Sequence, residues 1–277
     1  MDMTAAKHTT QGREAEFWDE VVESAQDRDE DLRVFPGDMF DRTMPWLKYM
    51  DFADYLQVVF DNIGLRPGMR VLDLGCGKGF LAAALAHRGA NVDAIDISSK
   101  SVERCRKRAE LSDVAERTNF HVMDCENLAF EDDSFDAVCG SFVLHHLDLE
   151  KIAKEVFRVL KPSGRSAFIE TFGLNPLLML ARSTLPGRFG IEKASSEDEY
   201  PLNRARIDKL QQHYPGKVSP AFPRVVFARM GGYLPFMNNM LGRGILKTFD
   251  RTFAVPAFLR TWSYYGVLKM NMEADGK

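Results

Sequence analysis

The chain has 277 residues, of which 45% are hydrophobic and 27% are charged, a composition typical of globular proteins. Its net charge of −4 gives no global reason to expect nucleic-acid binding. The four cysteines form no CxxC pair, so neither a metal site nor a disulfide framework is expected. No apolar leader and no bilayer-length apolar run are present, so the expected location is the cytoplasm.

The first part of the chain mixes acidic runs with aromatic residues. Residues 1–13 are polar and are expected to be loosely attached. Residues 14–62 predict two or three helices that precede the core and could fold over its ligand edge. We therefore expect residues 1–62 to form an N-terminal helical lid.

Strand and helix patterns then alternate over residues 69–172. Strands are predicted at 69–74, 91–97, 118–124, 134–143 and 165–172, and helices at 80–88 and 149–160. Either Ser98 or Ser99 can cap the helix that follows the second strand, and the sequence KPSG at 161–164 predicts a turn. Recurring strands with intervening helices indicate βαβ units and a parallel sheet.

After residue 172 the pattern loosens. A helix is predicted at 175–182, a sixth strand at 218–227 broken by Pro220 and Pro223, and a last strand at 261–270. Residues 231–260 suggest short helices separated by glycines. We expect an α/β fold, a doubly wound, mostly parallel seven-stranded sheet, with a helical cap inserted before the last strand. Residues 63–172 would form the core. Residues 173–277 would add further helices, the cap and the final strands of the same domain, on the side where a second ligand could bind.

The sequence from Asp73 to Gly79, DLGCGKG, follows the first strand and opens a helix. Alternate glycines let the backbone turn sharply and approach a ligand, although an ordinary tight turn would use the same residues. Phe80 stands where a dinucleotide fingerprint needs glycine, and no P-loop is present. A carboxylate before the glycines suits a cationic group, such as the α-ammonium of an amino acid.

Two further acids end the next two strands. Asp96 lies about 20 residues after the glycines, where a carboxylate can accept hydrogen bonds from ribose hydroxyls; it could instead cap the next helix. Asp124 ends the third strand and could accept from an adenine amino group, or lie in a solvated turn. Asp93 lies three residues before Asp96, deeper in the same strand, and is therefore less suited to reach the ligand edge. Because the carboxyl ends of parallel strands share one edge, the three acids together predict a site for S-adenosylmethionine (SAM).

The segments VLDLGCGKG, AIDIS, MDCENLAFEDDSFDAV, LHHL and EVFRVLKPSGR resemble the class I SAM-dependent methyltransferases, in particular the type-11 group. The resemblance covers residues 55–172. It implies that Asp73, Gly75, Gly77 and Gly79 hold the methionine part, Asp96 the ribose and Asp124 the adenine, with Cys125 contributing its backbone. The cofactor-binding set it implies is completed by Cys76, Ile97 and Ser141.

Three side chains are candidates on the acceptor side. His145 and His146 follow the fourth strand and could supply a base, although they could equally pack the following helix. Glu170, near the end of the fifth strand, could face the acceptor or be a buried hydrogen-bond acceptor. Residues 222–268 are rich in apolar side chains, with arginines and lysines between them. This pattern predicts a cap, a dimer interface, a hydrophobic acceptor pocket or a surface that rests on a membrane.

The function predicted from these patterns is methyl transfer from SAM to a small, hydrophobic, lipid-like acceptor. S-adenosylhomocysteine (SAH) would be the product, and no metal or nucleic acid would take part. The alternative is a non-catalytic SAM-binding protein that acts as a regulator or partner. Peripheral membrane contact and a homodimer are left open.

Overall fold

The computed structural model describes residues 10–24, 52–184, 200–223, 237, 239–253 and 257–272. The expectations for residues 1–9, 25–51, 185–199 and 224–236 lie outside these ranges. Residues 10–13, which were expected to be loosely attached, belong instead to the helix α2 (Thr10–Ser24). The prediction was wrong there because a polar stretch can be helical when its continuation packs on the protein, as α2 does on α6.

The core follows the predicted alternation closely. The elements run α4 (Phe52–Ile63), β1 (Arg70–Leu74), α5 (Phe80–His87), β2 (Asn91–Asp96), α6 (Ser99–Leu111), η2 (Ala115–Arg117), β3 (Thr118–Val122), β4 (Phe135–Ser141), η3 (Leu144–His146), α7 (Leu149–Val159) and β5 (Leu160–Thr171). Ser98 is the N-cap of α6 and accepts from the Ser101 amide, as one of the two expected caps. Asp148 caps α7 in the same way.

The C-terminal part adds two strands and peripheral helices. These are α8 (Pro176–Thr184), α9 (Arg204–His213), β6 (Lys217–Ala221), α10 (Met240–Phe253), η5 (Ala257–Trp262) and β7 (Tyr265–Asn271). The helices α10 and η5 lie between β6 and β7 in the chain, which is the predicted place of the inserted cap. Pro176 opens α8, where its missing amide hydrogen costs nothing.

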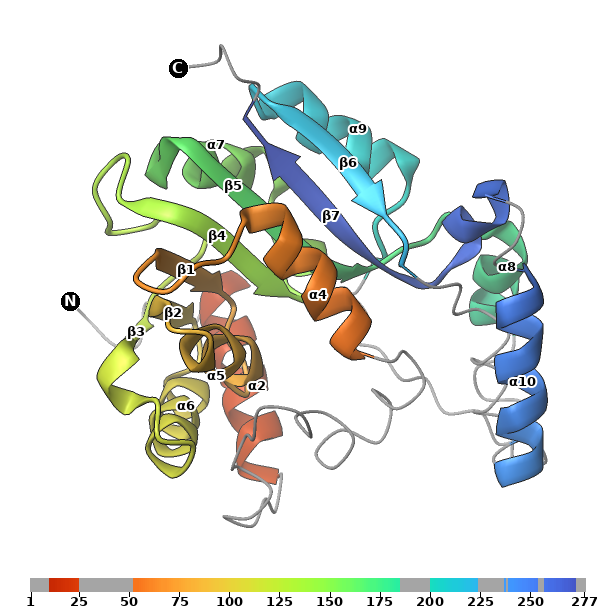
Figure 1. Cartoon of the computed structure of the whole chain (residues 1–277), viewed down its shortest axis with the longest axis horizontal. Coiled ribbons are helices and arrows are strands. Elements are labelled where there is room, and N and C mark those ends of the chain that lie inside the picture. Colours follow the sequence, from red (N-terminus) through yellow and green to blue (C-terminus); the bar gives the residue numbers. More distant parts are fainter. Residues whose placement is uncertain are drawn as a thin grey trace.

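The seven strands form one sheet in the order β3-β2-β1-β4-β5-β7-β6 (Figure 1). The first five are parallel, and β7 runs antiparallel to both β5 and β6. The strand order reverses between β1 and β4, so the crevice beyond their carboxyl ends is the place where ligands of such sheets bind. The predicted doubly wound, mostly parallel, seven-stranded sheet is confirmed.

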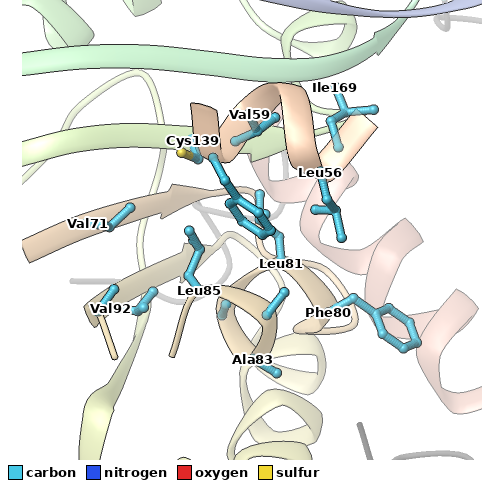
Figure 2. Close-up of a cluster of buried hydrophobic side chains, with 14 of the residues drawn as sticks. Leu56, Val59, Val71, Phe80, Leu81, Ala83, Leu85, Val92, Cys139 and Ile169 are labelled. Atoms are coloured by element: carbon cyan, nitrogen blue, oxygen red, sulfur yellow. The ribbon is translucent and has the colours of Figure 1, made fainter. Parts of the chain in front are cut away.

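Helices cover both faces of the sheet. In Figure 1, α4 crosses in front of the strands and α7 lies behind them. One apolar cluster packs α4, α5 and α6 on the front face. Figure 2 shows part of this cluster, with side chains from α4 (Leu56 and Val59), α5 (Leu81 and Leu85) and β1 (Val71). A second cluster packs α7 and α9 on the opposite face. The two clusters hold the β1 and β4 ends rigidly.

Three local predictions were wrong in detail. The KPSG sequence is included in β5 and is not a separate turn, but the register shifts there: Leu160 pairs with Phe135, and the next pair joins Arg165 to Ala137. Residues 161–164 therefore form a bulge in which the chain leaves the ladder without ending the strand.

The C-terminal helices also differ from the prediction. The helix α9 was missed, although Asn203 caps it and Ile207 and Leu210 are buried at helical spacing. Gly242 and Gly244 were expected to break the cap into short pieces, but both lie inside the 14-residue helix α10. Gly242 is in its first turn, where an added Cβ would lie 2.5 Å from the Met237 carbonyl oxygen, so its lack of a side chain allows close packing.

Candidate functional site

The turn between β1 and α5 lies at the predicted ligand edge. Asp73 in β1 is completely buried, and neither of its carboxylate oxygens has a hydrogen-bond partner among the described residues. Burial, and then the negative charge of Asp96, raise the pKa of Asp73 well above its usual range; the nearby Ala82 amide, which does not form a hydrogen bond of good geometry, opposes this rise only in part. A buried carboxylate without a partner is costly. The position therefore demands a cationic or hydrogen-bond-donating group from outside the described residues.

The glycines of the turn take backbone conformations that favour glycine. Gly75 and Gly79 have φ of 60° and 75°. An added Cβ would lie 2.4 Å from Val143 Cγ2 at Gly75 and 2.9 Å from Cys105 Sγ at Gly79. At Gly77, by contrast, an added Cβ would meet only the Gly75 carbonyl oxygen at 3.9 Å. Gly75 and Gly79 thus shape the turn, whereas Gly77 faces open space where a ligand can approach the backbone.

Asp96 joins this turn to the next helix. One carboxylate oxygen accepts from the Gly77 amide at 2.8 Å and the other accepts from the Ser98 amide at 2.9 Å. Burial raises the pKa of Asp96, and these amides oppose the rise. Each oxygen keeps a lone pair for a further donor. Asp93, three residues earlier, is held instead by Arg70 and His121.

The remaining predicted cofactor residues lie along the same edge. Asp124 follows β3, is half-buried and accepts from the Glu126 amide at 2.8 Å. Cys125 is buried next to it, and burial raises the pKa of its thiol. Cys76 lies in the turn with its Sγ 3.7 Å from that of Cys105; this contact and burial hold the pKa of Cys76 high. These cysteines are therefore protonated structural groups. Ile97 follows β2, and Ser141 ends β4.

A compact hydrogen-bonded group holds the chain after β4. Glu170 in β5 is completely buried and accepts from the Val143 amide at 2.9 Å and the Leu144 amide at 2.7 Å. Its other oxygen is 2.7 Å from His145 Nδ1. Phe142, directly before this group, has a φ of 57°, a strained conformation for a bulky residue that surrounding structure must enforce. Glu170 thus fixes the turn that carries Phe142 and both histidines.

His146 faces the N-terminal helix. Its Nδ1 lies 3.6 Å from a carboxylate oxygen of Glu14, and its ring meets that of Trp18 edge-on at 5.6 Å. From the same helix, Asp19 accepts from Ser98 Oγ at 2.5 Å and from the Lys100 amide at 3.1 Å. The helix α2 therefore touches both the start of α6 and the turn after β4.

Sequence analysis missed the individual residues of α2 that touch the site. Burial raises the pKa of Glu14, and Glu126, Asp96 and Asp124 raise it further, so Glu14 lies close to the acids of the predicted cofactor site. The only available signal was the acidic and aromatic composition of this segment. Within the described ranges, no group of three or more His, Cys, Asp or Glu side chains could hold a metal ion. No helix there is long and apolar enough to cross a membrane.

An open α/β sheet with a glycine turn, three acids at the carboxyl ends of its first three strands and a covering helix defines a nucleoside-binding class of protein. Residues 72–168 match the family model described as "Methyltransferase domain", and this segment belongs to that family. The resemblance to class I SAM-dependent methyltransferases is thereby confirmed for the core, and SAM is the cofactor of that family.

Among similar proteins is the methyltransferase GfsG of Streptomyces halstedii, 31% identical over 160 residues. The match covers 55% of this chain and 58% of that protein, so the chain spans less than two thirds of this relative.

Two solved structures resemble the chain over nearly its whole length. The geranyl diphosphate C-methyltransferase from Streptomyces coelicolor A3(2), solved with Mg²⁺, geranyl diphosphate and SAH, has a TM-score of 0.59 at 14% identity. It covers 96% of this chain and 100% of its own. The [4+2]-cyclase SpnF has a TM-score of 0.56 at 17% identity, covering 95% and 94%. At these identities the likeness concerns the fold alone.

Proposed function

We propose that the protein transfers a methyl group from SAM to a small, hydrophobic acceptor. The observation that carries this proposal is the buried carboxylate of Asp73, which has no hydrogen-bond partner among the described residues, directly precedes the glycine turn and is repelled by Asp96. A cationic ligand would offset both the cost of burying the Asp73 carboxylate and its repulsion by Asp96. An amino-acid cofactor with an α-ammonium and a sulfonium supplies such charges.

The residues at the edge fit the parts of SAM in chain order. Asp73 and the turn of Gly75, Cys76, Gly77 and Gly79 would hold the methionine part, with Gly77 offering open backbone. Asp96 would accept from ribose hydroxyls with its remaining lone pairs, and Asp124 from the adenine amino group. Ile97, Cys125 and Ser141 would line the site. When bound, the cofactor supplies an electrophilic methyl group on its sulfonium.

The chain's own contribution to catalysis would be mainly positioning, because displacement at a methyl group needs an aligned nucleophile. We propose that Glu170 acts through His145. Its carboxylate next to Nδ1 favours the tautomer with hydrogen on Nδ1, which leaves Nε2 as a base for an O–H or N–H acceptor. Glu170 would then be a positioning residue, with both oxygens occupied by the turn it holds. His146 would contact the lid.

The acceptor side is lined with aromatic rings. Phe142 lies 6.4 Å from the Phe52 ring and 6.0 Å from the Tyr265 ring, measured between centroids. Leu178 and Met179 of α8 pack against the same cluster. This wall begins beside the glycine turn, since Val143 follows Phe142 and touches Gly75. It supports a hydrophobic acceptor, and the helix α2 would close the cofactor side as a lid.

Calorimetry with SAM and SAH tests the cofactor part directly. Both should bind, and Asp96→Ala should weaken both by about 1.5–3 kcal/mol, because hydrogen bonds to a carboxylate are lost. Asp93→Asn is the matched control on the same strand and should leave the affinities unchanged, since Asp93 is held by Arg70 and His121. Unchanged affinity in Asp96→Ala would remove this residue from the ribose role.

Transfer itself is tested by incubating the protein with methyl-labelled SAM and extracts of metabolites and lipids. Label should move to an organic-soluble product. Tight SAM binding without any transfer would favour the alternative of a regulatory or partner protein.

A further inference from the structure

The aromatic wall of the acceptor side ends at Arg182, for which the described residues supply no counter-ion. Arg182 in α8 is half-buried, and its Nη1 donates to the Tyr264 hydroxyl. Its Nη2 is buried and has no hydrogen-bond partner within the described ranges. No carboxylate of the described residues lies within ion-pair distance of its guanidinium. An unsatisfied buried donor is costly, so Nη2 calls for an acceptor from outside the described residues.

A chain of ring contacts connects this arginine to the predicted site of transfer. The guanidinium carbon of Arg182 lies 5.8 Å from the centroid of the Tyr264 ring. The Tyr264 ring is 4.9 Å from that of Tyr265, which in turn meets Phe142 beside the glycine turn. An apolar ligand that lies along these rings would have one end near the cofactor site and the other near Arg182.

A second buried polar atom, next to Tyr265 in the sheet, also lacks a partner among the described residues. Thr171, at the carboxyl end of β5, pairs with Tyr265 of β7. Its hydroxyl is buried and has no hydrogen-bond partner among the described residues. Side chains alternate along a strand, so Thr171 faces the same side of the sheet as Ile169, which belongs to the front cluster with Tyr264 and Tyr265. One buried cation and one buried hydroxyl therefore border one aromatic wall.

We infer that Arg182 is the specificity-determining residue for an acceptor that carries an oxyanion, a carboxylate or a phosphate, on an apolar body. The inference rests on the proposed function, since it assigns the acceptor class of that same site. An oxyanion would accept from Nη2 and from the Thr171 hydroxyl, and would neutralise the guanidinium. The rings of Tyr264, Tyr265 and Phe142 would hold the apolar body and set its distance from the cofactor.

The test compares three ligands with one eight-carbon chain: octanoate, octyl phosphate and 1-octanol. Calorimetry is done at neutral pH with saturating SAH. The wild-type protein should bind one or both anions at least tenfold more tightly than the alcohol, because charge-assisted hydrogen bonds form only with the anions. The stronger of the two anions identifies whether the site suits a carboxylate or a phosphate.

Variants of Arg182 test whether a preference for anions depends on this residue. Arg182→Gln should lose the preference for anions, a fall of about ten- to a hundredfold in their affinity, while SAH affinity is unchanged. Arg182→Lys, which keeps the charge without the planar fork, should retain part of it. Arg204→Gln is the control, because Arg204 is exposed on α9 and pairs with Asp208. Melting temperatures verify that each variant is folded.

Three results would overturn the inference: equal affinity for the alcohol and both anions, no binding of any of the three, or an anion preference that survives in Arg182→Gln. Failure of the proposed function is distinguishable from these, because it shows as absent SAM and SAH binding whether or not the anions bind.

Discussion

At the scale of single residues, we expect Asp73 to favour cofactor binding and to lower the stability of the ligand-free protein. Its pKa is raised well above normal, so its ionised form destabilises the folded protein, and that cost grows as the pH rises from the ordinary carboxyl pKa through the raised one. Asp73→Asn removes the charge with little change of shape. We predict that it stabilises the ligand-free protein by about 1–3 kcal/mol at neutral pH, seen as a higher melting temperature.

The same substitution should weaken SAM binding by about one to two orders of magnitude, because an ammonium loses its carboxylate partner. The stability difference between Asp73→Asn and wild type should shrink as the pH falls towards the ordinary carboxyl pKa, where Asp73 is protonated in both folded and unfolded chains. A variant less stable than wild type at neutral pH, with SAM affinity intact, would contradict both the burial cost and the ligand role.

The two adjacent histidines are predicted to differ. His145 is fixed by Glu170, whereas His146 lies under Glu14 and Trp18 of α2. With an acceptor identified, His145→Gln should lower turnover by about 10²–10⁴ with SAM affinity unchanged. His146→Gln should instead change the affinity for SAM and leave the turnover of bound complex nearly intact. Full turnover in His145→Gln would mean that catalysis rests on positioning alone.

The motif residues show which parts of a site a sequence can reveal. The common edge of Asp73, Asp96 and Asp124 could be predicted because each lies at or just beyond the carboxyl end of a parallel strand, and such ends meet at one edge. The engagement of Glu170 with two amides and His145 could not, since it depends on a turn 26 residues earlier in the chain. Arg182 belongs to no sequence pattern; what distinguishes it is a buried Nη2 that no described residue satisfies.

At the scale of elements, α2 brings negative charge to the edge where we propose that SAM binds. Glu14 lies near Asp96, Asp124 and Glu126, and burial raises its pKa. We predict that Glu14→Gln weakens binding of SAM about two- to fivefold at neutral pH, a small effect because the side chain is partly exposed. Binding of SAH, which lacks the sulfonium charge, should change less. Calorimetry with both ligands measures this ratio.

Glu20→Gln, an exposed change on the same helix, is the control and should leave the ratio unaltered. The effect of Glu14→Gln should disappear as the pH falls through the raised pKa of Glu14, because the wild-type side chain is then neutral too. An equal loss of SAM and SAH affinity would show that α2 acts by packing alone and not by charge.

Elements with strong periodicity could be predicted, and those set by tertiary contacts could not. The helix α7 has an N-cap and one apolar face, and both are visible in the sequence. The helix α9 buries only Ile207 and Leu210, too short a pattern to distinguish from a loop before its neighbours are known. In α10, glycines suggested breaks, but Gly242 is required by the close approach of the Met237 backbone.

At the scale of the whole molecule, the cap is an insertion between two neighbouring strands. β6 and β7 are antiparallel, and Ala221 at the end of β6 pairs with Val267 of β7. Antiparallel neighbours can be joined by a short loop, so the sheet does not need the intervening residues to close. The described part of this insertion exposes large apolar side chains, namely Leu241, Ile245, Phe249 and Phe258. Such a surface is expected to be covered by another part of the protein, a ligand or a partner.

We therefore predict that residues 225–260 can be deleted, with Arg224 bridged to Thr261 through a short Gly-Ser linker, without loss of the cofactor site. Asp73, Asp96 and Asp124 all lie on strands or turns far from this join in the sheet order, since β4, β5 and β7 intervene between β1 and β6. SAH affinity should stay within a few-fold of wild type, whereas turnover of an identified acceptor should fall by at least tenfold, because part of the acceptor's cover is gone. Parallel calorimetry and label-transfer assays separate the two effects.

The matched control is Leu241→Gln with Ile245→Gln, which keeps the insertion but makes its exposed face polar. This double variant should retain more turnover than the deletion. A truncated protein that methylates its acceptor at the full rate would show that the insertion has no part in acceptor binding, and loss of SAH affinity would show that it supports the sheet.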